Sequence, residues 1–281
     1  MKAKLRGRIA KSRGVNWLIV VLSAMCVVPL LLILIYIIKA GIGAINWSFF
    51  VNIPKPVGEV GGGIANALIG TVIIISIAAA IAIPTGIMGG IYLNEYKNSR
   101  FAWWAGMCVD VLQGVPSIVI GIIGYLWLVV PFGSHSALAG SAVLAIMMLP
   151  IIIRSTEETL KLLPNSLREA AFSLGVPFHR MIMRVVVPCG LGGITSGAML
   201  AVARVAGETA PLLFTAFGNS FITANPLHPM QSLPLLIFNY ATSPYEDWQT
   251  LAWGASLVLL VLVLSLNLLT KLMTRKWKVQ L

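Results

Sequence analysis

The chain has few charged residues. Asp, Glu, Lys and Arg make up 10% of its 281 residues, whereas soluble domains carry roughly 25%. Hydrophobic residues make up 58%. Most of the surface must therefore face something less polar than water, which excludes an ordinary soluble domain and predicts an integral membrane protein.

Cysteine and histidine are also scarce, with three of each. Cys26, Cys108 and Cys189 lie far apart, and no pair has the short spacing of a zinc or redox site. The sequence also lacks the Gly-Lys-Ser or Gly-Lys-Thr of a P-loop ATPase. We therefore expect no metal site, no catalytic site and no cofactor bound by this chain itself.

Long apolar runs are what the sequence has in place of polar sites. A bilayer core of about 30 Å needs about 20 helical residues. Six runs reach or approach that length: residues 17–38, 65–92, 103–130, 137–153, 190–217 and 251–272. The sequence predicts an all-α, six-span transmembrane domain over residues 17–272. Pro116 and Ser117 interrupt the third run, so that span is either kinked or broken, and a broken helix can line a translocation path.

The net charge of +11 could suggest nucleic acid, but its placement does not. With a cytoplasmic N-terminus, 17 of the 20 Lys and Arg fall on the inner side, and only Lys39 and Lys55 fall on the outer side. This asymmetry is the positive-inside pattern of membrane proteins. The predicted cytoplasmic pieces are the basic N-terminus 1–16, residues 93–102, the loop 154–189 and the tail 273–281, with the boundary residue Lys271.

The segment 218–249 on the outer side is long and rich in proline. It contains Glu246 and Asp247 but no Lys or Arg, and residues 233–240 could form a short interfacial helix. Loops of this length are often functional. The segment is therefore either a folded cap over the spans or a surface for an external partner.

The cytoplasmic loop 154–189 has the signals of one short helix. Ser166 and Glu169 have the spacing of a capping box, and Gly175 suits a left-handed helix end. These signals predict a helix over residues 167–174. A helix this short is unstable alone, so it must pack either on its own spans or on another protein.

The same loop resembles a known family. Glu169-Ala170-Ala171, then Gly175 at the family's offset, apolar Ile182 and the closing pair at 187–188, Val-Pro, look like the EAA loop of importer-type, binding-protein-dependent ABC transporter permeases. The resemblance implies that fold, with the loop as a coupling helix docked on a dimer of a separate ATPase subunit, which would use ATP and Mg. Glu169, Ala170, Ala171 and Gly175 would then make the coupling contacts. The family often has Leu at the position of Val187.

The fifth run contains two charges at membrane depth, Arg204 and Glu208. Such charges are costly in lipid. Four residues apart on a continuous helix, they would share a face, and they would form either a structural salt bridge or a site on a solute path. An arginine is always charged, and its planar fork suits tetrahedral oxyanions. Gly193 and Gly197 form a seam of small residues that lets another helix approach.

Asp110 lies near the inner end of the third run. We expect it to cap a helix or to form a salt bridge with a basic residue of the loop. A role on a solute path is the alternative.

Two further tracts resemble phosphate-import permeases. They are Ala-Arg-Val-Ala-Gly-Glu-Thr-Ala-Pro-Leu-Leu-Phe-Thr-Ala at 203–216 and Asp-Val-Leu-Gln-Gly-Val-Pro-Ser-Ile-Val-Ile-Gly at 110–121. The sister permease of such importers shares the arginine and the Gly-Glu-Thr but diverges after the threonine. With the loop, the resemblance covers most of the chain from the second span onward.

This resemblance implies a permease subunit, not an enzyme, in a bacterial inner membrane, with Arg204 and Glu208 on the path of inorganic phosphate. The implied partners are a second permease, the ATPase dimer, an external phosphate-binding protein and membrane lipid, with no nucleic acid. The alternatives are another oxyanion such as sulfate or molybdate, an ion-driven carrier, or an intramembrane enzyme.

Overall fold

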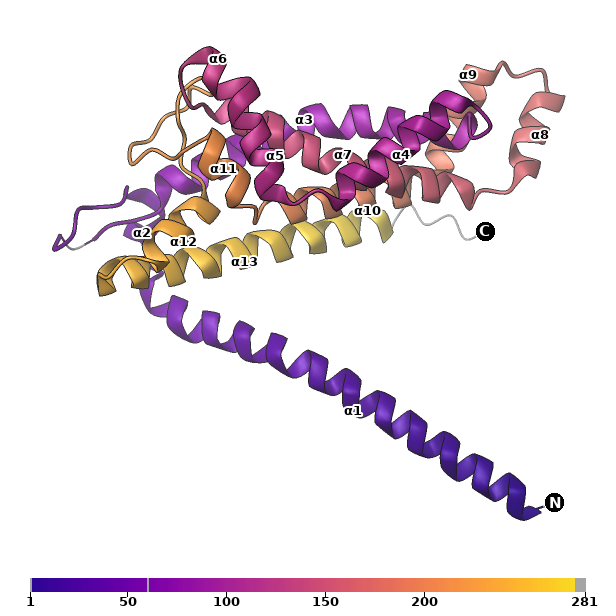
Figure 1. Cartoon of the computed structure of the whole chain (residues 1–281), viewed down its shortest axis with the longest axis horizontal. Helices are drawn as coiled ribbons and strands as arrows, with labels where there is room; N and C mark the ends of the chain where they lie inside the picture. The colour runs from indigo at the N-terminus through magenta and orange to yellow at the C-terminus, as the bar shows by residue number, and fades with distance from the viewer. Residues whose placement is uncertain (1, 60, 276–281) are drawn as a thin grey trace.

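The computed structural model describes residues 2–59 and 61–275 (Figure 1). Its helices are α1 (Lys2–Gly41), α2 (Trp47–Val51), α3 (Ala65–Glu95), α4 (Arg100–Gly114), α5 (Ser117–Gly124), α6 (Val130–Phe132), α7 (Ala137–Lys161), α8 (Asn165–Ser173), α9 (Phe178–Met181), α10 (Val187–Val205), α11 (Ala210–Thr215), α12 (Leu233–Ala241) and α13 (Glu246–Arg275). Within these ranges the only β pairing is an isolated bridge between Phe217 and Met230. The all-α prediction is confirmed. Residues 276–281 of the predicted tail lie outside the described residues.

Five helical stretches are long and apolar enough to cross a membrane. They are Ser12–Ala44, Ala65–Glu95, Ala137–Lys161, Phe178–Val205 and Glu246–Leu272. A sixth span results if Arg100–Gly114 and Ser117–Phe132, which are bent by 104° relative to each other, count as one. Each of the six apolar runs therefore has a helical counterpart.

The third span is broken. The helix α4 ends at Gly114, and Val115 has φ −71° and ψ 129°, an extended conformation. The ring of Pro116 disfavours a helical conformation for the residue before it. The chain therefore turns sharply at this point, which we call the elbow (residues 115–116), before α5 begins at Ser117.

The fifth span differs from the prediction of one helix over residues 190–217, which is wrong. The helix α10 ends at Val205, and α11 begins only at Ala210. Gly207 has a low helix propensity, and Pro211 favours the first turn of a new helix over the interior of a continuing one. Both residues stop the helix between 206 and 209, which we call the α10–α11 break.

Small residues allow three central helices to pack closely. A Cβ atom at Gly86 of α3 would lie 2.7 Å from Cγ2 of Ile152 in α7, and one at Gly90 would lie 2.5 Å from Cβ of Thr156. On a neighbouring face of α7, a side chain at Gly197 of α10 would overlap Ser155. The predicted small-residue seam of the fifth span is confirmed, and α7 is the helix that packs into it.

The helix α1 diverges from the rest of the bundle (Figure 1). None of its most apolar stretch is buried. It meets the bundle near its C-terminal end, where the rings of Tyr36 and Trp253 pack edge to face at 5.0 Å. The predicted helix at 233–240 is present as α12. Three of its leucines, Leu233, Leu235 and Leu236, are buried in the interior of the chain.

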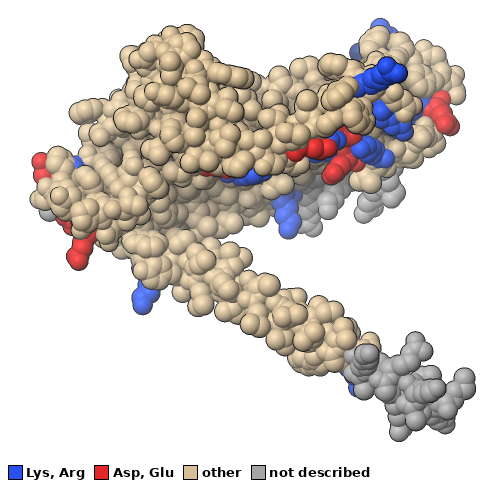
Figure 2. Space-filling model, viewed as in Figure 1, with Lys and Arg blue, Asp and Glu red and all other residues tan. Residues whose placement is uncertain are grey.

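Charged side chains gather at one end of the bundle. Figure 2 shows Lys and Arg, with Asp and Glu among them, at the end that carries α8 and α9, which we call the α8 end. The opposite end, formed by α2 and α12, has few basic side chains (Figures 1 and 2). The charge asymmetry read from the sequence is therefore also an asymmetry between the two ends of the folded chain.

Candidate functional site at the broken spans and the α8 end

The helix predicted over residues 167–174 is present as α8, but the capping box is not formed. Pro164 is the N-cap residue, with φ −65°, and no side chain caps the helix. The helix therefore starts at Asn165, so Ser166 lies inside its first turn, where its hydroxyl cannot act as the N-cap group.

Gly175 ends α8 in the way the sequence predicts. Its φ is +70°, in the left-handed region. The N–H of Gly175 donates to the carbonyl of Phe172 at 2.9 Å, and the N–H of Val176 donates to the carbonyl of Ala171 at 3.1 Å. This pair of bonds is the Schellman motif, which satisfies carbonyl groups at a helix end.

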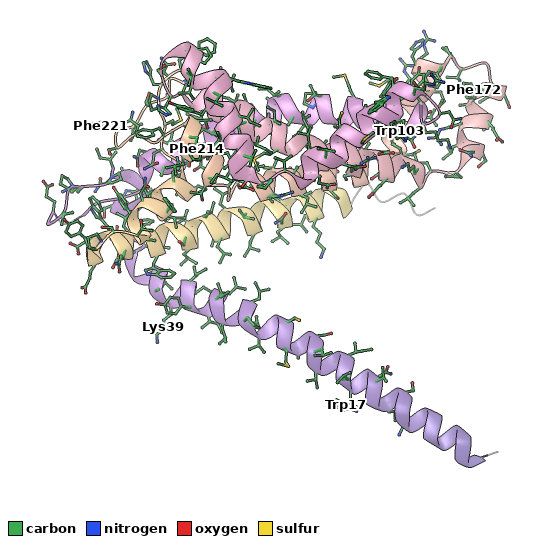
Figure 3. All side chains as sticks on the ribbon, in the orientation of Figure 1. Trp17, Lys39, Trp103, Phe172, Phe214 and Phe221 are labelled. Atoms are coloured by element: carbon green, nitrogen blue, oxygen red, sulfur yellow. The ribbon has the colours of Figure 1, made fainter. Side chains whose placement is uncertain are left out.

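The predicted coupling residues point in different directions. Ala171 is buried, in a cluster that includes Leu160, Met181 and Ile182. Glu169, Ala170 and Gly175 are exposed. Two large apolar side chains beside them, Phe172 and Leu174, are 48% and 83% exposed, and Figure 3 labels Phe172 at this end of the molecule. One alanine thus packs α8 on its own chain, while the other lies on an open surface.

Arg204 and Glu208 do not share a helix face. Arg204 occupies the last turn of α10 and is exposed, and Glu208 follows in the α10–α11 break and is partly exposed. The N–H of Glu208 donates to the carbonyl of Val205 at 3.1 Å. Across the described ranges, neither side chain forms an ion pair with any other residue. The structural salt bridge is therefore absent, because the helix that would have aligned the two charges ends between them.

The α10–α11 break is connected to the elbow through α5 and α11. A Cβ atom at Gly121 of α5 would lie 2.7 Å from Cα of Pro211 in α11. The second halves of the two broken spans are thus in direct backbone contact. Irregular backbone at membrane depth is tolerated where it is buried in protein or lines a cavity, so the two interruptions mark this region as a candidate path.

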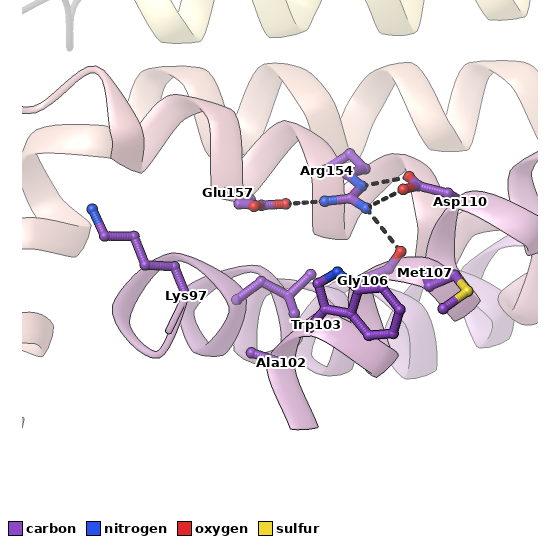
Figure 4. Close-up of a pocket in the computed structure, with 9 residues that line it drawn as sticks. Lys97, Ala102, Trp103, Gly106, Met107, Asp110, Arg154 and Glu157 are labelled. Carbon is purple, nitrogen blue, oxygen red and sulfur yellow. Dashed lines mark hydrogen bonds and ion pairs between the residues drawn. The ribbon is translucent and has the colours of Figure 1, made fainter. Parts of the chain in front are cut away.

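Arg154 holds the largest charged cluster at the α8 end (Figure 4). Its Nε donates to Oδ1 of Asp110 at 2.9 Å, and its Nη2 lies 2.7 Å from Oδ2. The same Nη2 donates to the carbonyl of Gly106 at 2.8 Å, and Nη1 pairs with Glu157 at 2.5 Å. Lys161 completes the cluster at 2.6 Å from the other oxygen of Glu157. The predicted salt bridge of Asp110 with a basic residue is confirmed.

Arg154, Glu157 and Lys161 lie on α7, because that helix continues past residue 153 to Lys161. The prediction that a loop begins at residue 154 is wrong in this respect. Their spacing of three and four residues is the signal that could have shown a continuing helix, since such residues lie side by side on one helical face.

Two cavities lie beside this cluster. One, of about 360 Å³, is bordered by Lys97, Trp103, Asp110 and Arg154. The other, of about 660 Å³, is bordered by Asp110, Arg154 and Ser155 and also by Leu200 of α10. Leu200 is one helical turn before Arg204 and therefore on the same face. A polar hollow thus extends from the α8 end toward the face of α10 that carries Arg204.

Among the residues that the structure describes, no three His, Cys, Asp or Glu side chains could together hold a metal ion. The charged groups of the site are those of Arg204, Glu208 and the Arg154 cluster, together with Lys97 and Glu158, which border the two cavities.

Comparisons with known proteins agree with this architecture. Residues 82–279 match the family model of the binding-protein-dependent transport system inner membrane component. The phosphate transport system permease protein PstA of Yersinia pestis is 42% identical over 250 residues, which cover 89% of this chain and 85% of that protein. PstA of Haemophilus influenzae is 41% identical over 241 residues, covering 85% of each chain.

Solved structures show the same fold at lower identity. The MetNI methionine ABC transporter in an inward-facing conformation matches with a TM-score of 0.66 and 17% identity, over 76% of this chain and 96% of that chain. An amino acid ABC transporter matches with a TM-score of 0.55 and 18% identity, over 75% and 92%. These two likenesses extend to the fold alone.

The family model covers well over half of the chain, and the sequence relatives are matched over most of their own length. The chain therefore belongs to the inner membrane components of binding-protein-dependent transport systems and, within them, to the family of PstA permeases.

Proposed function

We propose that the chain is the permease subunit of an ATP-driven importer of inorganic phosphate, with Arg204 and Glu208 on the path of the anion. The observation that carries this proposal is an arginine that is exposed at a break between two helices and pairs with no carboxylate in the described chain. A permanent charge at membrane depth costs at least about 2.5–3.5 kcal/mol on insertion scales. An anion that passes beside it offsets that cost.

The two charges have complementary tasks in this proposal. The guanidinium of Arg204 presents parallel N–H donors that fit two oxygens of a phosphate at once. The carboxylate of Glu208 either accepts a proton from the anion or repels its fully ionised form. The site therefore binds phosphate without retaining it, as transport requires.

In the same proposal, the surface at the α8 end binds the subunit that hydrolyses ATP. A separate ATPase dimer, which uses ATP and Mg, docks on α8 through the exposed side of Glu169, Ala170 and Gly175, and Ala171 anchors the helix to this chain. The excess of basic groups at this end supports a cytoplasmic position for it and for both termini. The other proposed partners are a second permease, an external phosphate-binding protein that docks at residues 218–249, and membrane lipid.

Uptake of radiolabelled phosphate by cells that lack this chain tests the proposal. We expect uptake to fall to background and to return when the chain is supplied, while a tenfold excess of sulfate leaves the restored uptake unchanged. Competition by sulfate would instead indicate a permease for another oxyanion. Restoration in the absence of any ATPase subunit would indicate an ion-driven carrier.

A further inference from the structure

We propose that Arg168 of α8 and Glu95 of α3 form a positioning pair that transmits movement of α8 to α4 and to the elbow. This inference rests on the proposed function, because it assigns a route by which the ATPase contact reaches the anion path. Neither residue is among those that carry the resemblance to the EAA loop, and neither lies on the candidate path.

The pair joins two elements that are far apart in the sequence. Nη2 of Arg168 lies 3.0 Å from Oε1 of Glu95, and the side chains are only 16% and 7% exposed. Nδ2 of Asn94 donates to the same carboxylate oxygen at 2.8 Å. Removing one partner of a shielded pair leaves an uncompensated charge, which is strongly unfavourable. The pair therefore fixes α8 against the end of α3.

A row of aromatic rings makes a second connection at the same place. The rings of Phe178 in α9 and Tyr96 lie 6.1 Å apart, and Tyr96 stacks on Tyr92 of α3 at 5.0 Å. Tyr92 in turn packs edge to face on Phe101 of α4 at 5.8 Å. Such ring contacts stabilise the fold by more than the burial of their apolar area alone. The row thus ties the segment after α8 to the end of α3 and the start of α4.

The route by which movement of α8 is transmitted continues from α4 to the anion site. Residues 96–99 alone separate α3 from α4, so the start of α4 must follow the end of α3. At its other end α4 stops at the elbow, beyond which α5 touches Pro211 of α11. Glu208 lies in the α10–α11 break just before α11. A displacement of α8 therefore has a continuous packed route to the break.

A competing route exists along the backbone, because residues 162–164 connect α7 directly to α8. Along that route the Arg168–Glu95 pair would only stabilise the fold. The two possibilities differ in one quantity, the number of phosphate ions transported per ATP hydrolysed. A transmitting pair changes this ratio in assembled complexes, whereas a purely stabilising pair changes only how much complex assembles.

The experiment uses the complete importer, purified and reconstituted with its partner subunits. Glu95→Gln and Arg168→Gln are each expected to lower the transport-to-hydrolysis ratio roughly three- to tenfold, in the range that mutations along coupling networks produce. The exchanged variant, with Glu95→Arg and Arg168→Glu together, is expected to restore much of it. Arg184→Gln is the matched control, because Arg184 is an exposed arginine in the helical stretch Phe178–Val205 that follows α8.

An unchanged ratio in both single variants would overturn the proposal. So would a loss of assembly in both single variants with an unchanged ratio in the complexes that still form, since the pair would then be structural. If the unmodified complex transports another oxyanion and not phosphate, the cargo assignment fails, but the ratio measured with that anion still decides the role of the pair.

Discussion

Replacing Arg204 with alanine is expected to abolish phosphate uptake while the importer still assembles. The side chain is exposed and forms no ion pair in the described chain, so its truncation creates no cavity and leaves no buried carboxylate unpaired. On the proposed path, the variant loses a charge-assisted bidentate site for the anion. Removing one partner of such a charge pair costs about 2–5 kcal/mol, which corresponds to a fall in the initial uptake rate of roughly thirtyfold or more.

Two variants make this result specific. Arg204→Lys keeps the charge but loses the planar fork, so uptake at an intermediate rate is expected. Arg180→Ala removes an exposed arginine at the α8 end and should leave uptake within about twofold of normal, as surface substitutions usually do. Co-purification of the ATPase subunit reports assembly in each case. Normal uptake by Arg204→Ala would remove this residue from the anion path.

Replacing Gly175 with valine is expected to weaken association with the ATPase subunit about tenfold. The residue has φ +70°, and no atom lies within 4 Å of a Cβ built there, so the effect is conformational and not steric crowding. A β-branched residue in the left-handed region is a strong outlier, at a cost of about 1–3 kcal/mol. The Schellman bonds to Phe172 and Ala171 would loosen, and the exposed face of α8 would lose its fixed shape.

A dilution series of the solubilised complex, followed by co-purification, measures this association. Gly175→Asn is the matched control, because asparagine tolerates the left-handed conformation and should retain most of the binding. Equal losses in the valine and asparagine variants would contradict the conformational explanation. Unchanged association of the valine variant would show that the end of α8 takes no part in docking.

The parts of the fold that depend on local pattern could be predicted from the sequence. Six apolar runs of membrane-spanning length predict the spans, and each has a helical counterpart. Gly175 predicts the end of α8 because only a few residue types accept a positive φ. The glycines at 193 and 197 predict a close helix contact, and α7 fills it.

The predictions of features that depend on tertiary packing were wrong or incomplete. The four-residue spacing of Arg204 and Glu208 places them on one face only if the helix continues. Gly207 and Pro211 favour a break, and the direction that α11 then takes depends on its packing on α5. The capping box of Ser166 and Glu169 competes with a start at Pro164, whose fixed φ suits the entry to a helix. The apolar pattern alone could not show whether the fifth span continues or breaks, nor at which residue α8 starts.

The Arg154 cluster illustrates a different limit. The sequence predicts that Asp110 pairs with a basic residue, but Asp110 and Arg154 are separated by 44 positions. Their contact exists because α4 packs on α7 in the folded chain. A single sequence shows the proline that breaks the span, but it does not show the angle at which the two halves meet.

Accessibility of position 204 from water decides whether an anion can pass beside this residue. In an importer whose Cys26, Cys108 and Cys189 are replaced by serine, Arg204→Cys would be treated with a small charged thiol reagent, with and without phosphate and ATP. We predict that the thiol reacts, and that phosphate during turnover slows the reaction. A thiol that stays unreactive from both aqueous sides in every state would contradict a passage for the anion beside this residue.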